Sequence, residues 1–120
     1  MPHVDAPVKG PSRLFQLRIY ESHSEAAALK KIEMFNEGGE IALFDRIGLR
    51  PVFFGQTLAG PRQPNLVYMT VHADMAAREK TWDAFRNDDG WKKLSADPNF
   101  ANTVSATTVV FLRPAAYSQI

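Results

Sequence analysis

One arginine and a small set of aromatic and histidine residues carry most of the capacity for chemistry in this sequence. Arg18 lies in the middle of LFQLRIY, residues 14–20, a segment with the alternation typical of a β-strand. A guanidinium keeps its charge at any accessible pH, so Arg18 needs an acceptor. That acceptor is either a protein group, which we expect to belong to a partner subunit, or an anionic ligand.

The other candidate ligand-binding residues share expected strands with Arg18 or lie on the helix that follows. With Arg18 they form the set Arg18, Tyr20, Phe53, Tyr68, His72 and Trp82. Trp82 and Trp91 also suit core packing, which is the commoner role of tryptophan. His72 closes an expected strand, where histidine is more often solvated than part of a pocket.

Metal sites and nucleophilic catalysis find little support. There is no cysteine and no GxSxG, and the three histidines, His3, His23 and His72, do not pair at ligand spacing. Gly38 and Gly39 interrupt a helical pattern and do not join a strand to a helix, so they do not predict a phosphate-binding loop. Glu33, Glu37 and Glu40 recur at helical spacing and predict a solvated face. We expect no metal and no cofactor.

Length and composition indicate one globular domain. The chain has 120 residues, 45% hydrophobic and 22% charged, and a formal net charge of +1. This balance predicts neither nucleic acid nor a membrane as partner. The absence of cysteine fits a reducing compartment, and we expect a cytoplasmic location. Residues 1–12, with three prolines and a glycine, predict a flexible leader or linker ahead of a domain at 13–120.

The elements follow from hydrophobic period and turn residues. Ser22 and Glu25 have capping-box spacing ahead of a helix. Gly48 suits the left-handed end of that helix, and Asp74 suits the cap of the next one. We expect strands at 14–20, 50–58, 66–72 and 103–112, one long helix at 24–47 kinked by its two glycines, a second helix after Asp74, and a short helix at 91–96. The order β-α-β-β-α-β predicts an α+β ferredoxin-like sandwich with a four-stranded antiparallel sheet.

Alternation also predicts which sheet face the helices cover. The more uniformly apolar set is expected beneath the helices: Phe15, Leu17, Ile19, Val67, Met69, Val71, Thr108, Val110 and Leu112. The opposite face is then expected to carry Gln16, Arg18, Tyr20, Phe53, Leu66, Tyr68, Thr70, His72, Val109 and Phe111. That second face is too apolar to remain exposed on a monomer, so we expect a second copy of the sheet to cover it.

Four segments resemble the NIPSNAP family: FQLRIY, FDRIGLRPVFFG, PNLVYMTVHADMAAREKTWDAF and RPAAYSQI. The resemblance covers about Arg13 to Ile120 and implies membership of the dimeric α/β-barrel superfamily, with a homodimer formed through the sheet faces. Family members often carry two such domains in tandem, and this chain resembles one half.

The resemblance implies a domain without an assigned reaction, and a fold alone does not specify one. We expect it to bind a small apolar or aromatic molecule in a pocket of the dimeric barrel. Two alternatives are a cofactor-independent monooxygenase acting on an aromatic substrate, and a structural or protein-interaction domain with no ligand.

Overall fold

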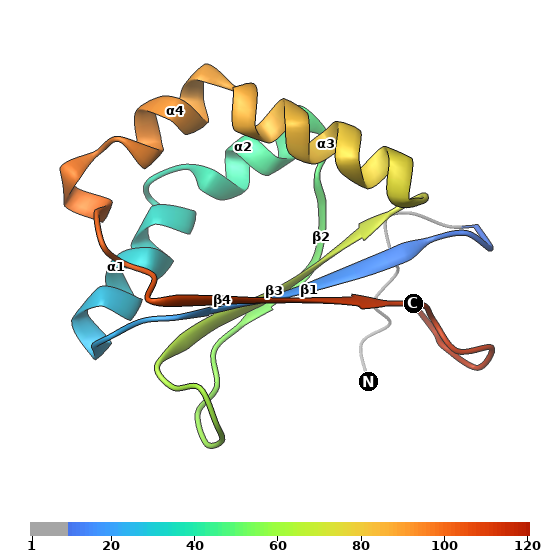
Figure 1. Cartoon of the computed structure of the whole chain (residues 1–120), viewed down its shortest axis with the longest axis horizontal. Coiled ribbons are helices and arrows are strands. Elements are labelled where there is room, and N and C mark those ends of the chain that lie inside the picture. Colours follow the sequence, from blue (N-terminus) through green and yellow to red (C-terminus); the bar gives the residue numbers. More distant parts are fainter. Residues whose placement is uncertain (1–9) are drawn as a thin grey trace.

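The computed structural model describes residues 10–120, and the elements follow the predicted order. Most of the expected leader, with His3, lies outside these residues. Four antiparallel strands form one sheet in the order β2-β3-β1-β4, and all the helices lie on one side of it (Figure 1). The elements are β1 (Leu14–Glu21), α1 (Glu25–Phe35), α2 (Glu40–Ile47), β2 (Arg50–Gly55), β3 (Asn65–His72), α3 (Met75–Asn87), α4 (Asp89–Ser95), the short 3-10 helix η1 (Pro98–Phe100) and β4 (Ala106–Leu112). The predicted α+β ferredoxin-like fold is confirmed.

The single long helix expected at 24–47 is two helices. α1 ends at Phe35 and α2 begins at Glu40, because the chain turns at Gly38 and Gly39. Gly39 has φ 91°, which favours glycine, and a Cβ on Gly38 would come within 2.5 Å of the Met34 carbonyl oxygen. The break changes which side chains of the second half point inward.

Two of the three predicted helix-end residues are confirmed. Asp74 caps α3 by accepting a hydrogen bond from the Ala77 amide, and Gly48 ends α2 at φ 81°. The expected capping box is wrong, since Ser24 rather than Ser22 caps α1. Ser22 instead donates to the Thr103 carbonyl at 2.5 Å, which fastens the end of β1 to the segment before β4.

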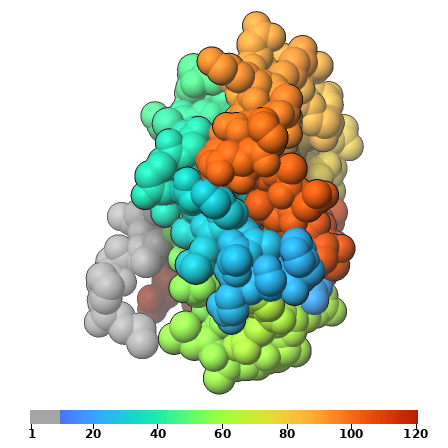
Figure 2. Space-filling model, turned by 90° about the vertical axis from the view of Figure 1, so that its left-hand side faces the viewer, coloured from blue at the N-terminus to red at the C-terminus, as the bar shows by residue number. Residues whose placement is uncertain are grey.

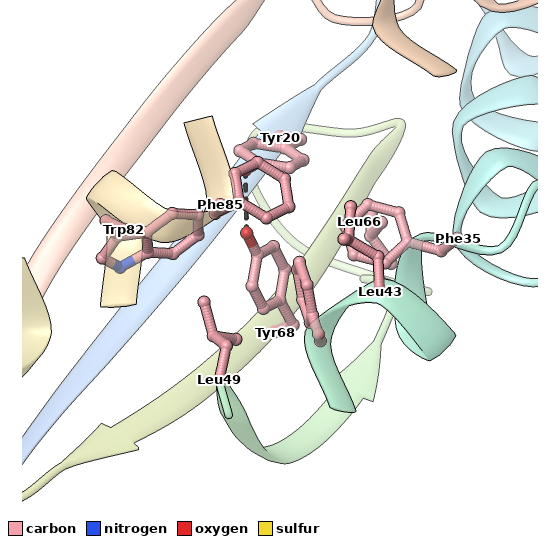
Figure 3. Packing of buried hydrophobic residues seen from close by; sticks show 9 residues of the cluster. Tyr20, Phe35, Leu43, Leu49, Leu66, Tyr68, Trp82 and Phe85 are labelled. Carbon is pink, nitrogen blue, oxygen red and sulfur yellow. Dashed lines mark hydrogen bonds between the residues drawn. The ribbon is translucent and has the colours of Figure 1, made fainter. Parts of the chain in front are cut away.

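The main core lies between the helices and the sheet and is dominated by aromatic rings (Figure 3). Phe44 of α2 is fully buried and meets Phe35, Tyr68, Trp82 and Phe85 with ring centroids 5.6–6.3 Å apart. Most of these pairs are edge-to-face, the arrangement in which aromatic rings attract. This core holds the helical layer on β1 and β3.

The predicted assignment of the two sheet faces is wrong. Tyr20, Leu66 and Tyr68 belong to the core under the helices, whereas Phe15, Met69 and Val71 form a separate cluster on the other face. The inversion arises because Tyr20 and Tyr68 bury their rings while their hydroxyls bond to each other, and Trp82 buries its ring while its nitrogen donates to Gln16. The count of apolar residues on each face therefore did not identify the covered one.

We call the face turned away from the helices the open face. Its cluster of Phe15, Met69 and Val71 also packs against Leu17, Val52 and the terminal Ile120. The β2–β3 loop reaches across beneath it, where Arg62 donates to the Thr108 hydroxyl of β4. Figure 2 shows this loop, in green, on the opposite side of the molecule from α4. Of residues 10–120, no helix has the length and apolar character needed to cross a membrane.

Candidate functional site

Arg18 lies on the helix-covered face and not on the open face where it was expected. Its Nε donates to the Tyr20 hydroxyl at 3.0 Å, and its guanidinium lies 4.6 Å from the centre of the Trp82 ring. No carboxylate of residues 10–120 lies within 4 Å of it. The expected position of Arg18 on a barrel interior is therefore wrong, since the side chain points towards α3 in its own subunit. Its pairing with a group of a partner subunit stays a prediction.

Two tyrosine hydroxyls continue the contact made by Arg18. The Tyr20 and Tyr68 oxygens are 2.8 Å apart, drawn as the dashed line in Figure 3, and their rings meet edge-on at 5.5 Å. Burial raises the pKa of Tyr68 well above its ordinary value, so this phenol stays protonated. The pair gives the Arg18 guanidinium a neutral, polar contact in place of an ion pair.

These residues border a hollow of about 220 Å³ between α3 and the sheet, which we call the arginine cleft. Its aromatic lining is Tyr20, Trp82, Phe85 and Trp91. Its ionisable lining also includes Arg18, Arg78, Arg86 and Glu40. The volume is below that of a drug-sized pocket and suits a compound with a single ring.

Positive charge predominates in the arginine cleft. Burial lowers the pKa of Arg78, and repulsion from the Arg18 and Arg86 guanidinium groups lowers it further. Arg86 is paired with Asp83, whereas Arg78 donates through Nε to the Gln16 side-chain oxygen at 2.9 Å. An anion in the cleft would relieve this repulsion.

Gln16 fixes the orientation of two cleft side chains. This residue is fully buried on β1, and its Oε1 accepts both from Arg78 and from the Trp82 indole nitrogen, the latter at 3.1 Å. The Gln16 side-chain oxygen thus links β1 to two side chains of α3 that line the cleft, Arg78 and Trp82. Sequence alternation alone had placed Gln16 on the same face as Arg18, and that relation is correct.

A buried ion pair stands behind the cleft. Lys31 Nζ of α1 lies 3.4 Å from Glu40 Oε2 of α2, and both side chains are less than a tenth exposed. Burial raises the pKa of Glu40, opposed by Lys31, and burial lowers the pKa of Lys31, opposed by Glu40. Each partner attracts the other's charged form, while the shared burial disfavours both charges.

The structure brings together four of the six candidate residues. Arg18, Tyr20 and Trp82 line the cleft, and Tyr68 supports Tyr20 from below. Phe53 pairs with Met69 on the other face, 43% exposed. His72 lies farther along β3, where its Nε2 meets the Thr70 hydroxyl at 2.9 Å, and it does not line the cleft.

Sequence reasoning missed Lys31, Glu40, Arg78 and Arg86, and it wrongly placed Glu40 on a solvated face. Helical spacing had grouped Glu40 with Glu33, but the glycine pair breaks that phase. The Gly38–Gly39 pair was the sequence signal that Glu33 and Glu40 belong to different helices.

The other hollows have less defined chemistry. Two larger ones, of about 460 and 510 Å³, lie on the helical surface and share Glu37. Within residues 10–120 no three histidine or acidic side chains gather closely enough to hold a metal ion. A third hollow, of about 300 Å³, is lined by Arg13, Asp74 and Arg113. None of these three hollows contains a residue of the predicted set, whereas the arginine cleft contains Arg18, Tyr20 and Trp82, so we take it as the candidate site.

Comparison with known proteins agrees with the fold. The sequence model of the NIPSNAP family matches residues 15–119. A search of curated proteins finds no match. The chain is similar to the crystal structure of a NIPSNAP-like domain protein from Burkholderia xenovorans, with a TM-score of 0.79 and 18% identity over 91% of this chain and 90% of that one.

Two structures from Agrobacterium tumefaciens are also similar. One is a NIPSNAP family protein, with a TM-score of 0.75 and 19% identity over 88% of this chain and 96% of that one. The other, described as a NIPSNAP family protein with unknown function, has a TM-score of 0.73 and 19% identity over 92% and 95%. At this identity the likeness shows a shared fold.

Proposed function

The chain belongs to the NIPSNAP family, and we propose that its domain binds a small aromatic anion in the arginine cleft. The observation that carries this proposal is the half-buried Arg18 guanidinium, which has aromatic and phenolic neighbours but no carboxylate within 4 Å among residues 10–120. A carboxylate-bearing ring supplies both the missing charge and a surface for stacking. The family itself has no assigned reaction, so the proposal concerns binding.

The lining of the cleft supports a flat ligand. Trp82 and Trp91 are both in contact with Phe85, at ring-centroid distances of 5.2 and 4.4 Å. They form one aromatic wall beside three guanidinium groups. Apolar walls with a few converging polar groups are typical of small-molecule sites. The arrangement favours a charged aromatic compound over the purely apolar ligand that the sequence also allowed.

Tryptophan fluorescence tests this directly, because both tryptophans of the chain line the cleft. We expect phenylacetate to change the emission with a saturable curve, and the uncharged analogue benzyl alcohol to bind more weakly. Arg18→Gln should reduce the affinity for phenylacetate by at least about tenfold, since a charge-assisted hydrogen bond contributes about 1.5–3 kcal/mol. Arg62→Gln, in the loop beneath the open face, is the matched control and should bind as the wild type does. Equal affinities in wild type and Arg18→Gln would refute the proposal.

We propose as well that a second copy of the chain covers the open face. Phe53, Val110 and Leu112 are 37–43% exposed there, beside the buried cluster of Phe15, Met69 and Val71. Phe53 lies on one edge strand of the sheet and Val110 and Leu112 lie on the other, and a second sheet packed on this face would bury both edges. With a formal net charge of only +1, the chains should repel one another little.

Light scattering tests the assembly, with an expected mass of twice the chain mass of 13.4 kDa. Val110→Lys should shift the protein towards the monomer, because it places a charge within the covered face. Val109→Lys is the matched control, since it lies next in the same strand but points to the helix side, opposite Arg18. A wild-type protein that stays monomeric would refute this second proposal.

A further inference from the structure

Glu40 is the carboxyl group among the side chains lining the arginine cleft. It is 2% exposed, and it comes from the first turn of α2, whereas Arg18 comes from β1 and Arg86 from α3. A carboxyl group and a cation on different walls of one small cleft are the parts that proton transfer on a bound anion requires.

Lys31 holds Glu40 from behind. Its Nζ lies 3.4 Å from Glu40 Oε2 and sits over the rings of Tyr20 and Phe35, at 5.2 and 5.0 Å from their centroids. The ammonium group thus contacts aromatic faces, the Met34 sulfur at 3.3 Å and a single carboxylate oxygen, and the Lys31 side chain is only 7% exposed. Glu40 keeps its other oxygen free of any hydrogen bond within residues 10–120.

Burial raises the pKa of Glu40 and lowers that of Lys31. A carboxyl with a raised pKa is a stronger base than one in water, and its proton is exchanged closer to neutral pH. The charged and titratable groups around it are Lys31 of α1, Arg18 and Tyr20 of β1, Tyr68 of β3, and Arg78 and Arg86 of α3.

Building on the proposed function, we infer that the arginine cleft is a proton-transfer site in which Glu40 removes a proton from an enolisable aromatic keto acid held by Arg18. The C–H bond next to the carbonyl breaks and its proton goes to the Glu40 carboxylate. The electron pair of that bond forms a carbon–carbon double bond, and the carbonyl electrons move to oxygen to give an enolate. Return of the proton to this oxygen gives the enol, and return to carbon restores the keto form, so no oxidant or reductant is consumed.

The cations of the cleft assist both stages of this reaction. Arg18 matches the substrate carboxylate, and its neighbours Arg78 and Arg86 offset the charge that develops on the enolate oxygen. Lys31 keeps Glu40 in the ionised form that can accept a proton, while its charge moderates the basicity that burial gives to this carboxylate. The same Lys31–Glu40 contact also joins α1 to α2 across the glycine break, a structural role that would not by itself affect a substrate.

Phenylpyruvate in deuterated water is the probe, because it has a ring, a carboxylate and an acidic methylene beside a carbonyl. We expect wild-type protein to accelerate exchange of the methylene protons, followed by proton NMR. Glu40→Gln should lose at least about a hundredfold of that acceleration, in the range that general acid–base groups contribute. Its phenylpyruvate affinity, from tryptophan fluorescence, should stay within about threefold. Glu33→Gln, on the outer side of α1, is the matched control and should exchange at the wild-type rate.

The outcomes separate this inference from the binding proposal. Phenylpyruvate that binds without accelerated exchange overturns the inference and leaves the proposed function standing. Failure to bind phenylpyruvate overturns the inference alone when phenylacetate still binds, and overturns both proposals when phenylacetate fails to bind as well. Undiminished exchange in Glu40→Gln also overturns the inference. Should Glu40→Gln fail to fold, the double variant Lys31→Met with Glu40→Met replaces both charges by apolar groups, a change that buried pairs often tolerate. If the double variant folds, it should show no accelerated exchange, and acceleration equal to that of the wild type would overturn the inference.

Discussion

The face of the sheet that the helices cover has the more polar side chains, and the open face has the more uniformly apolar ones. The helix-covered face carries Arg18, Tyr20 and Tyr68, whose polar atoms meet one another, while the open face carries aliphatic side chains and phenylalanine. Burying a polar atom costs little when it is hydrogen-bonded, and large rings contribute much apolar area. The size of the aromatic rings and the hydrogen bonds of their polar atoms therefore indicate which face is covered better than a count of apolar residues does.

The largest contrast should appear when one phenylalanine from each face is truncated. Phe44→Ala removes a fully buried ring that contacts four other aromatic rings, and we expect a loss of about 3–5 kcal/mol in the free energy of unfolding. Phe53→Ala on the open face is the matched change and should cost under about 1 kcal/mol in the dilute, single-chain state, because Phe53 is 43% exposed there. At concentrations where the proposed dimer forms, the loss should be larger. Urea unfolding measures both. Equal losses would mean that the open face is as well covered in solution as the helix side.

A second contrast concerns a buried histidine of the covered face. Burial, with a smaller effect of Arg78, lowers the pKa of His72 to about 4 from its ordinary 6.5. Below pH 6.5 the unfolded chain therefore binds a proton that the folded chain does not, so stability falls as the pH falls from 6.5 towards 4. The size of this effect is about 3 kcal/mol at most.

His72→Gln should reduce the pH dependence of unfolding in that window. The exposed His23 provides the control, and His23→Gln should leave the dependence as it is in wild type. Chemical denaturation at several pH values between 4 and 7 measures the effect. If the His72→Gln and wild-type curves run parallel, His72 is not buried in its neutral form.

A third contrast tests the glycine that places the helical layer over the sheet. Gly48 ends α2 at φ 81°, and Gly48→Val should cost about 2 kcal/mol because a β-branched residue is strained there. Gly55→Val in β2 is the control, since Gly55 has an ordinary φ and open space around its Cα. It should change stability by under about 0.5 kcal/mol. Thermal melts compare the two, and an equal response would place the end of α2 elsewhere.

Most of the fold could be predicted from alternation and turn residues, because these are local signals. The strand LFQLRIY, the cap at Asp74 and the glycine end at Gly48 are each specified within a few residues. Face assignment is a non-local property. It depends on Gln16 and Arg18 finding partners on α3 and β1, and spacing along one strand does not contain that information.

The candidate site was predicted in part for the same reason. Arg18, Tyr20 and Trp82 were identified from residue type, and the structure brings them together. Glu40 and Lys31 were missed because their pairing spans the break at Gly38 and Gly39, where helical phase is lost. A glycine pair inside an apparent helix is therefore better treated as a boundary than as a kink.

The smallest expected effect on stability is also the most informative about Arg18. Arg18→Met removes a hydrogen bond to the Tyr20 hydroxyl and a contact with the Trp82 ring, but it leaves no carboxylate of residues 10–120 without its partner. Methionine retains the apolar stem and relieves the cost of burying a charge. We therefore expect a loss of about 1 kcal/mol and a folded protein.

The alternative predicted from sequence, an ion pair buried between subunits, would cost about 3–5 kcal/mol on the same substitution. Urea unfolding distinguishes the two values. Arg50→Met is a suitable control, because Arg50 pairs with the exposed Asp45 and should cost under about 0.5 kcal/mol. A large loss in Arg18→Met alone would show that the guanidinium holds the fold or the assembly together, and the proposed anion site would then lack its main support. A small loss with phenylacetate binding abolished would assign the charge of Arg18 to the ligand.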